Sequence, residues 1–263
     1  MRATATAMLM ALSIAALAQE RSLTCEQNRS SGNSRQQRFC EMREYTVGAV
    51  PRLSADGNTN GGIAVKGWNR SDILVRAKVE SWAASEGEAR AIAGQITVQS
   101  AGGSVKADAP DFGKDRGWAV SYEIFVPNRT DLNLKSHNGG ISIADVHGNL
   151  EFSAVNGGVS LKRLGGSVRG TTVNGGMNVE LAGSRWDGDQ LNVSATNGGV
   201  ALLLPENYSA RLEAGTVNGR VSVDYPAAVQ GRIEREMSIT LGGGGPLIRA
   251  TTTNGGVSVK RKS

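Results

Sequence analysis

Side chains that could support metal, phosphate or nucleophilic chemistry are few and scattered in this sequence. The two histidines, His137 and His147, lie in no His-Glu-x-x-His pattern, so zinc binding is not indicated. The glycine run 242–245 is followed by Pro246 instead of Lys and Ser or Thr, which argues against a phosphate-binding loop. No Gly-x-Ser-x-Gly motif marks a serine nucleophile. We therefore predict no catalytic residue, no cofactor and no metal site.

Calcium is the one ion that the acidic residues leave open. Asp187 and Asp189, with Asp145 elsewhere, could supply oxygen ligands, but the Gly-Gly-x-Gly-x-Asp repeat of calcium-binding coils is absent. Solvated loop carboxylates are the simpler interpretation. The formal charge of +5 is spread along the chain, which does not indicate nucleic acid as a partner.

The amino terminus and the two cysteines indicate an exported protein. Met1-Arg2, an apolar run over 7–16 and the small-x-small pair Ala16 and Ala18 form a secretory signal peptide over residues 1–18, with cleavage after Ala18. We expect a periplasmic or secreted protein with no transmembrane segment after cleavage. In such an oxidising compartment, Cys25 and Cys40 are expected to form a disulfide, worth about 3 kcal/mol for a loop of about 15 residues.

The elements that would position any site follow from an internal repeat. The chain of 263 residues is rich in glycine, with 35, and 5 % aromatic. Seven Asn-Gly pairs occur, and the residues three and five positions after each Asn are apolar throughout. The predicted turn residues are Asn60, Gly61, Asn138, Gly139, Asn156, Gly157, Asn174, Gly175, Asn197, Gly198, Asn218, Gly219, Asn254 and Gly255.

The repeat spacing favours a coil over a series of hairpins. From Asn138 onward the steps are 18, 18, 23, 21 and 36 residues, and 36 reads as two turns of 18. The fold prediction is all-β, a parallel β-solenoid with turns of roughly 18 residues; a stack of hairpins is the alternative. The Asn-Gly corners are expected to need positive φ, and their Asn side chains could stack as a ladder.

One outward row of small residues is the candidate contact face. If the two apolar residues of each repeat point into the core, the residue between them points outward. This position carries Ser142, Ser160, Asn178, Ser222 and Ser258, with Ala64 and Ala201 in the other two copies. The row could contact a repetitive partner, or its small side chains could only relieve crowding beside the corners.

The amino-terminal half is less regular. Alternating apolar residues predict strands over 73–79 and 118–126, and Ser85 with Glu88 begins one short helix through a capping box. This part is expected to cover one end of the coil, and the basic residues 260–262 the other. We divide the chain into the signal peptide 1–18, a disulfide-containing segment 19–44 and a repeat domain 45–263.

Several motifs together resemble a known family. They are Val65-Lys-Gly-Trp68-Asn-Arg before an alternating strand, the serial Val-Asn-Gly-Gly or Thr-Asn-Gly-Gly, Leu203-Leu-Pro205, and Gly242-Gly-Gly-Gly-Pro246-Leu-Ile-Arg249 before the last repeat. Over roughly residues 45–261 the chain resembles the bacterial putative-adhesin family of β-strand repeat proteins, a domain of unknown function. The resemblance implies an exported β-helix-like domain and no catalytic residues.

These observations predict a non-catalytic exported protein with an adhesion-like or scaffolding role at the bacterial cell envelope. Its partner would be an envelope or cell-surface protein or polysaccharide. The alternative is a secreted β-helical enzyme that degrades polysaccharides, which would need lysine, arginine and carboxylate side chains clustered on one exposed face.

Overall fold

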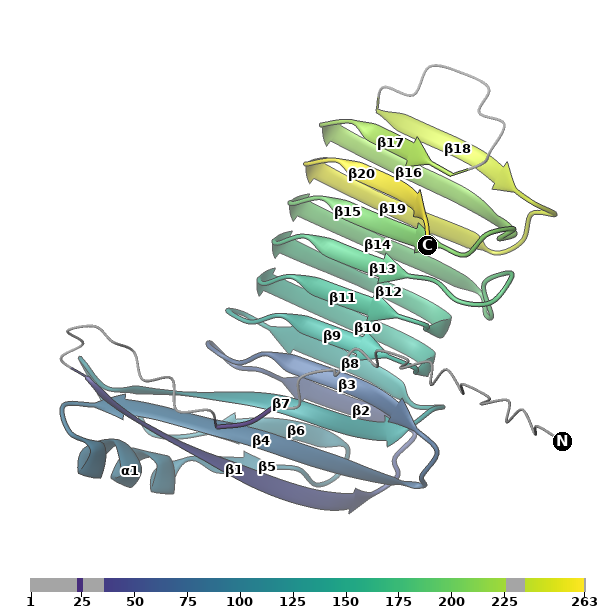
Figure 1. The fold of residues 1–263 in the computed structure, drawn as a ribbon. Coiled ribbons are helices and arrows are strands. Elements are labelled where there is room, and N and C mark those ends of the chain that lie inside the picture. Colours follow the sequence, from purple (N-terminus) through teal and green to yellow (C-terminus); the bar gives the residue numbers. More distant parts are fainter. Residues whose placement is uncertain (1–22, 26–35, 226–234, 263) are drawn as a thin grey trace, which may run out of the picture.

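The computed structural model describes residues 23–25, 36–225 and 235–262, and these form two ten-stranded sheets and one helix (Figure 1). Sheet A consists, in spatial order, of β1 (Gln37–Gly48), β4 (Asp72–Ala83), β7 (Gly117–Pro127), β3 (Ile63–Trp68), β9 (Ile141–Ala144), β11 (Val159–Lys162), β13 (Met177–Glu180), β15 (Val200–Leu204), β20 (Val257–Arg261) and β17 (Val221–Asp224). Sheet B consists of β18 (Glu236–Leu241), β16 (Ala210–Asn218), β19 (Leu247–Asn254), β14 (Gln190–Asn197), β12 (Gly165–Asn174), β10 (His147–Asn156), β8 (Asp131–Ser136), β2 (Arg52–Asp56), β6 (Ser104–Asp108) and β5 (Thr97–Gln99).

Most of the stack is parallel, as the repeat predicted. The two strands that flank an Asn-Gly corner lie in different sheets, and each pairs with the equivalent strand of the next copy. Thus Leu150 of β10 lies opposite Val168 of β12, and Val159 of β11 lies opposite Met177 of β13, both at an offset of 18 residues. Because the corner does not join two neighbours in one sheet, the alternative of stacked hairpins is wrong.

The carboxyl-terminal strands correct one sequence inference. β19 lies between β14 and β16, and β20 lies between β15 and β17 (Figure 1). The 36-residue step from Asn218 to Asn254 is therefore not two further turns. β18 runs antiparallel to β16 along its outer edge, and the chain then returns on the inner edge. The end of the stack is formed by β17 and β18, so the expectation that residues 260–262 cover it is wrong.

The core lies between the two sheets and is built from layers of equivalent side chains. One residue per strand of sheet A stacks in register, and its counterparts in sheet B face it from the other side. One such layer in sheet A contains Ile63, Ile141, Val159, Met177, Val200, Val257 and Val221, and all are at most 3 % exposed. The spacing of apolar residues therefore places one surface of each sheet in the core.

The amino-terminal part covers the other end of the stack. β1, β4 and β7 pair antiparallel, and helix α1 (Glu86–Gln95) packs against β4 and β1 (Figure 1). Ser85 caps the helix by accepting a hydrogen bond from the Glu88 amide, as predicted. The Glu88 carboxylate pairs with Arg116 and does not return to Ser85, so the capping box is only half formed.

The predicted disulfide between Cys25 and Cys40 is present and attaches the amino-terminal segment to β1. β1 runs without interruption across residues 44 and 45, where the sequence analysis placed a segment boundary. The signal-peptide residues 1–18 lie outside the described residues. No helix among the described residues has the length and apolar character needed to cross a membrane.

Candidate functional site

The predicted contact residues form one continuous row across sheet A. Cross-strand register links Ala64 to Ser142, then to Ser160, Asn178, Ala201, Ser258 and finally Ser222. Asn178 and Ser222 are exposed, whereas Ser142, Ser160 and Ser258 are half-buried. None of the four serine hydroxyls bonds to another described residue. Together these seven residues are called the small-residue row below.

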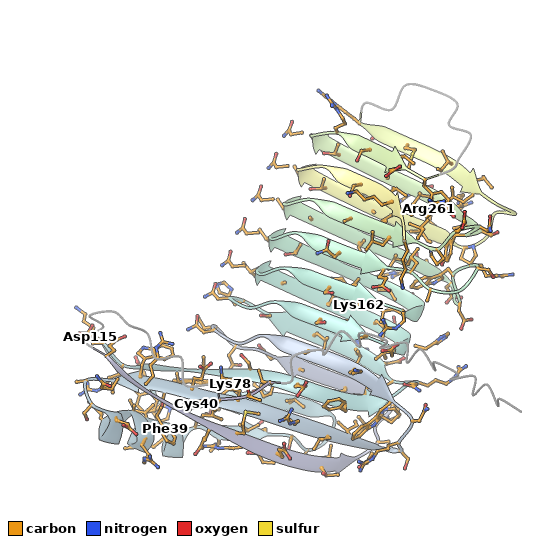
Figure 2. All side chains as sticks on the ribbon, in the orientation of Figure 1. Phe39, Cys40, Lys78, Asp115, Lys162 and Arg261 are labelled. Atoms are coloured by element: carbon orange, nitrogen blue, oxygen red, sulfur yellow. A yellow bond between two sulfur atoms is a disulfide. The ribbon has the colours of Figure 1, made fainter. Side chains whose placement is uncertain are left out.

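Two different rows border the small-residue row. On the corner side lie the second glycines of the repeats, which leave this part of the face without side chains. On the other side, two residues further along each strand, lie mainly charged residues such as Lys162, which Figure 2 shows on β11, and Glu180 beside it. Glu180 is paired with Lys262. The row is thus low, polar and continuous with a charged border.

The corner asparagines form a hydrogen-bonded ladder along one edge of the stack. Each Asn donates from Nδ2 to the Oδ1 of the preceding rung, at 3.1 Å from Asn138 to Asn60 and at 2.8 Å in the rungs beyond. The ladder continues through Asn174 and Asn197, and Asn254 stands between Asn197 and Asn218. All seven amides therefore point in the same direction, with their N–H groups toward Asn60.

The reason for the corner glycines differs from the one expected. Of the seven glycines that follow Asn, only Gly255 has a positive φ, at 157°, close to fully extended backbone. What these glycines provide is close contact between rungs, because a Cβ on Gly157 would lie 2.1 Å from the carbonyl oxygen of Gly139. The prediction that these corners need positive φ is wrong for the other six, and the need for glycine is steric.

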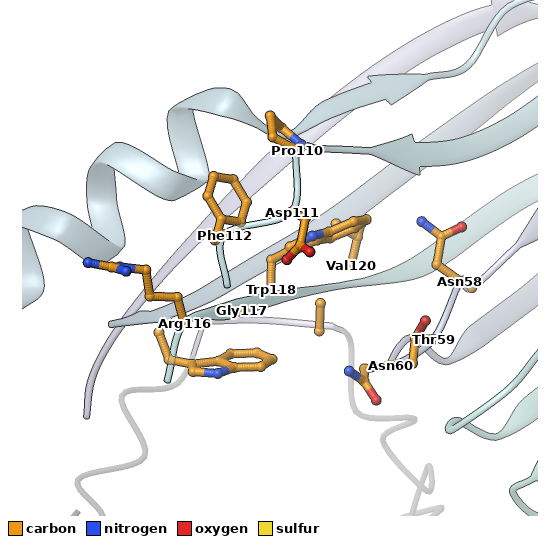
Figure 3. A pocket seen from close by; sticks show the side chains of 13 residues that line it. Asn58, Thr59, Asn60, Pro110, Asp111, Phe112, Arg116, Gly117, Trp118 and Val120 are labelled. Atoms are coloured by element: carbon orange, nitrogen blue, oxygen red, sulfur yellow. The ribbon is translucent and has the colours of Figure 1, made fainter. Parts of the chain in front are cut away.

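A pocket that the sequence analysis missed lies at the first rung of the ladder. It has a volume of about 270 Å³ and is formed by residues 57–60, Trp82 of β4, residues 110–112 and residues 116–120 (Figure 3). β3 pairs with β7 only from Tyr122 onward, so the first residues of β7 have a strand neighbour on one side alone. The pocket opens along this unpaired edge.

Three of the few aromatic side chains meet in this pocket: Trp82, Phe112 and Trp118. The antiparallel pairing of β4 with β7 places Trp82 opposite Gly117, where a Cβ would lie 2.5 Å from the indole ring. Gly117 therefore allows the indole to lie against the strand. Phe112 and Trp118 pack against a small cluster of buried residues between α1 and β4.

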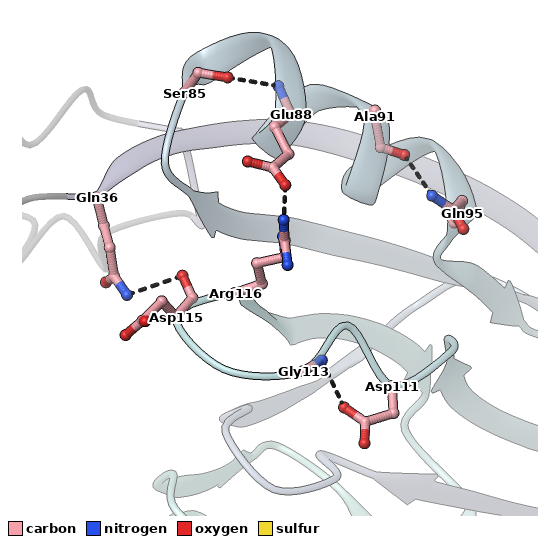
Figure 4. Close-up of polar contacts among 9 residues, drawn as sticks. All are labelled: Gln36, Ser85, Glu88, Ala91, Gln95, Asp111, Gly113, Asp115 and Arg116. Atoms are coloured by element: carbon pink, nitrogen blue, oxygen red, sulfur yellow. Dashed lines mark hydrogen bonds and ion pairs between the residues drawn. The ribbon is translucent and has the colours of Figure 1, made fainter.

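Polar contacts fix the loop that carries Asp111 and Phe112 (Figure 4). The Asp111 carboxylate accepts a hydrogen bond from the Gly113 amide at 2.9 Å. Arg116 pairs with Glu88 of α1, and Gln36 donates to the carbonyl oxygen of Asp115. Because the Arg116 guanidinium is directed to Glu88, it does not neutralise Asp111, whose other oxygen stays available to a ligand.

The acidic residues considered for calcium lie in separate pairs. Asp145 binds Arg163 through two hydrogen bonds of 2.6 and 2.7 Å, and this pairing lowers the pKa of Asp145. Asp187 lies 3.4 Å from Nδ1 of His147. Nowhere in the described part of the chain do three His, Cys, Asp or Glu side chains gather to hold a metal ion.

Comparisons with solved structures show distant similarity over most of the chain. A putative cell adhesion protein from Clostridium sporogenes is 14 % identical with a TM-score of 0.45, and the match covers 84 % of this chain and 100 % of that one. A putative adhesin from Bacteroides fragilis is 14 % identical with a TM-score of 0.43 and coverage of 85 % and 97 %. A putative adhesin from Parabacteroides distasonis is 10 % identical with a TM-score of 0.38 and coverage of 80 % and 97 %. No curated protein matches the chain.

The family comparison covers nearly the whole sequence. The family model described as Toastrack DUF4097 matches residues 16–260, a range that includes every strand described above except the last residue of β20. This confirms the resemblance drawn from the Asn-Gly-Gly repeats and the glycine-rich stretch before the last one. The chain belongs to the Toastrack DUF4097 family of bacterial putative-adhesin proteins.

Proposed function

We propose that this protein is a non-catalytic, exported component of the bacterial envelope that makes adhesion-like or scaffolding contacts through the outer face of sheet A. The observation that carries the proposal is the small-residue row, which crosses seven strands in unbroken register. The signal-peptide pattern before Gln19 supports export, and the Cys25–Cys40 disulfide fits an oxidising compartment.

The chemistry of the row suits a repetitive partner. Neighbouring strands are about 4.7–4.9 Å apart, so the serine hydroxyls recur at this interval. Each hydroxyl can both donate and accept a hydrogen bond, and none is occupied by another described residue. Because the side chains are short and the adjacent glycines have none, an extended polymer or a second sheet could approach the backbone closely.

The proposal treats the parallel part of the fold as a β-solenoid that ends in one rearranged turn. The offset of 18 residues between paired strands supports this interpretation, and the insertion of β19 and β20 is the rearrangement. A solenoid presents equivalent groups on successive turns, which is the geometry that a repetitive partner would recognise.

Retention on envelope fractions tests this function. The purified domain, starting at Gln19, is incubated with cell-wall, outer-membrane and polysaccharide fractions, and bound protein is measured as its concentration is raised. Saturable retention without turnover is expected. Release of soluble sugars from any polysaccharide by the pure protein would contradict the non-catalytic role and favour the polysaccharide-degrading alternative.

A further inference from the structure

We infer that the pocket at the first rung of the asparagine ladder binds a single sugar ring of a glycan. This site is separate from the small-residue row, so the inference goes beyond the proposed function and does not depend on it. Its volume of about 270 Å³ lies just below the range of about 300–1,000 Å³ that is usual for drug-sized ligands. It therefore suits one small ring-shaped group.

The aromatic residues of the pocket carry unused hydrogen-bond donors. Elsewhere in the chain, Trp68 donates from its indole nitrogen to Asp72 and Trp186 donates to Gly166, each at 2.9 Å. The indole nitrogens of Trp82 and Trp118 donate to no other described residue. Buried or half-buried tryptophans usually satisfy this group, so two open donors at one pocket indicate a ligand that offers acceptors.

Acceptors are present beside these donors. The Oδ1 atom of Asn58 is buried and has no hydrogen-bond partner among the described residues, although its Nδ2 donates to Ala107. Asp111 retains one carboxylate oxygen that bonds to no described group. Figure 3 shows Asp111 on one side of the pocket, near Trp118, with Asn58 and Asn60 on the other. A ligand between them would meet acceptors on both sides.

Asn60 adds a polarised donor. It is the terminal rung of the ladder, and its Oδ1 accepts from Asn138 while its Nδ2 donates to no described residue. Figure 3 shows this amide nitrogen turned toward the interior of the pocket. Hydrogen bonds in an aligned chain polarise one another, so the six bonds behind Asn60 strengthen its free N–H group as a donor.

This combination favours a sugar over other small ligands. A hydroxyl donates and accepts at the same time, so a polyhydroxylated ring can satisfy the indole and amide donors and the Asn58 and Asp111 acceptors together. Its C–H surfaces can pack on the aromatic side chains. A quaternary ammonium ion would use the aromatic rings and Asp111 but would leave the donors of Trp82, Trp118 and Asn60 unsatisfied.

Tryptophan fluorescence tests the inference, since two of the four tryptophans line the pocket. The folded mature protein is titrated separately with maltotriose, cellotriose, mannotriose and the trimer of N-acetylglucosamine, and with choline and trialanine as a cation and a peptide. At least one trisaccharide is expected to shift the emission saturably. Saturation by choline or trialanine alone, or by none of the probes, would overturn the inference.

A pair of ladder variants localises the binding. Asn60→Ala and Asn218→Ala each remove one terminal ladder hydrogen bond, at opposite ends of the stack, so they are matched in stability. Asn60→Ala is expected to weaken trisaccharide binding about three- to tenfold, the effect of losing one hydrogen bond to a neutral group, while Asn218→Ala leaves it unchanged. Equal affinities for the two variants would place the sugar elsewhere and reject this pocket.

Discussion

Replacing the first glycine of a corner should destabilise the fold far more than replacing the second. In Gly157→Ala the new Cβ would lie 2.1 Å from the carbonyl oxygen of Gly139, and an ordinary contact is about 3.4 Å, so the rungs must separate by roughly 1.3 Å. In Gly158→Ala the nearest atom, the carbonyl oxygen of Gly176, is 3.6 Å away, which is ordinary contact. The two variants add the same methyl group at adjacent positions.

The expected magnitude follows from the contacts that must give way. Overpacking of this kind costs about 1–3 kcal/mol. Separating the rungs also weakens the ladder bonds on both sides of Asn156, each worth about 0.5–1.5 kcal/mol. The free energy of unfolding should therefore fall by about 3–5 kcal/mol in Gly157→Ala, and Tm by roughly 6–20 °C for a domain of this size.

The control variant should behave differently. Gly158 has no positive φ, so alanine is compatible with its backbone and reduces the entropy of the unfolded chain. Its Tm should lie within about 3 °C of the parent. Thermal unfolding followed by circular dichroism and calorimetry measures both variants, with Gly175→Ala and Gly176→Ala as a second matched pair. Equal Tm values within each pair would refute the steric explanation of the corners.

Three further predictions concern the amino terminus and an ion pair. Amino-terminal sequencing of the exported protein should return Gln19, and recovery of an uncleaved chain would contradict the signal peptide. Thiol titration of the unfolded, unreduced protein should find no free thiol, and reduction of Cys25–Cys40 should lower stability by about 3 kcal/mol. Arg163→Gln should raise the pKa of Asp145 toward its ordinary value in an NMR titration; the lowered pKa means that this carboxylate stabilises the fold above its unfolded-state pKa and loses that effect as the pH falls through the folded one, so an unchanged titration curve would contradict the pairing.

The repeat was readable from the sequence because it imposes a local signal on every turn. Apolar residues three and five positions after each Asn mark the inward side chains, and the constant step of 18 residues implies parallel register. The insertion of β19 and β20 could not be read in the same way. A 36-residue step is compatible both with two turns and with a strand that reverses along β18, and only the pairing of β16 with β18 separates them.

The candidate sites differ in the same respect. The small-residue row follows from strand alternation alone, so its members could be named in advance. The pocket could not, because Trp82, Phe112 and Trp118 are brought together by the antiparallel pairing of β4 with β7 and by one loop. The low aromatic content of the whole chain argued against such a pocket, and it gave no information on how unevenly those residues are distributed.

The most direct test of the proposed function compares the two outer faces of the stack. Lysine at Ser142, Ser160 and Ser222 adds three charges to the small-residue row of sheet A. Lysine at Ser153, Thr171 and Ser194 adds three charges to the outer face of sheet B, where these residues are also in cross-strand register.

Retention of both triple variants on the same envelope fractions is the decisive measurement. The account predicts that the sheet A variant loses saturable retention while the sheet B variant binds like the parent, with Tm values for the two variants that remain close. Full retention of the sheet A variant, or equal loss in both, would contradict the assignment of sheet A as the contact face.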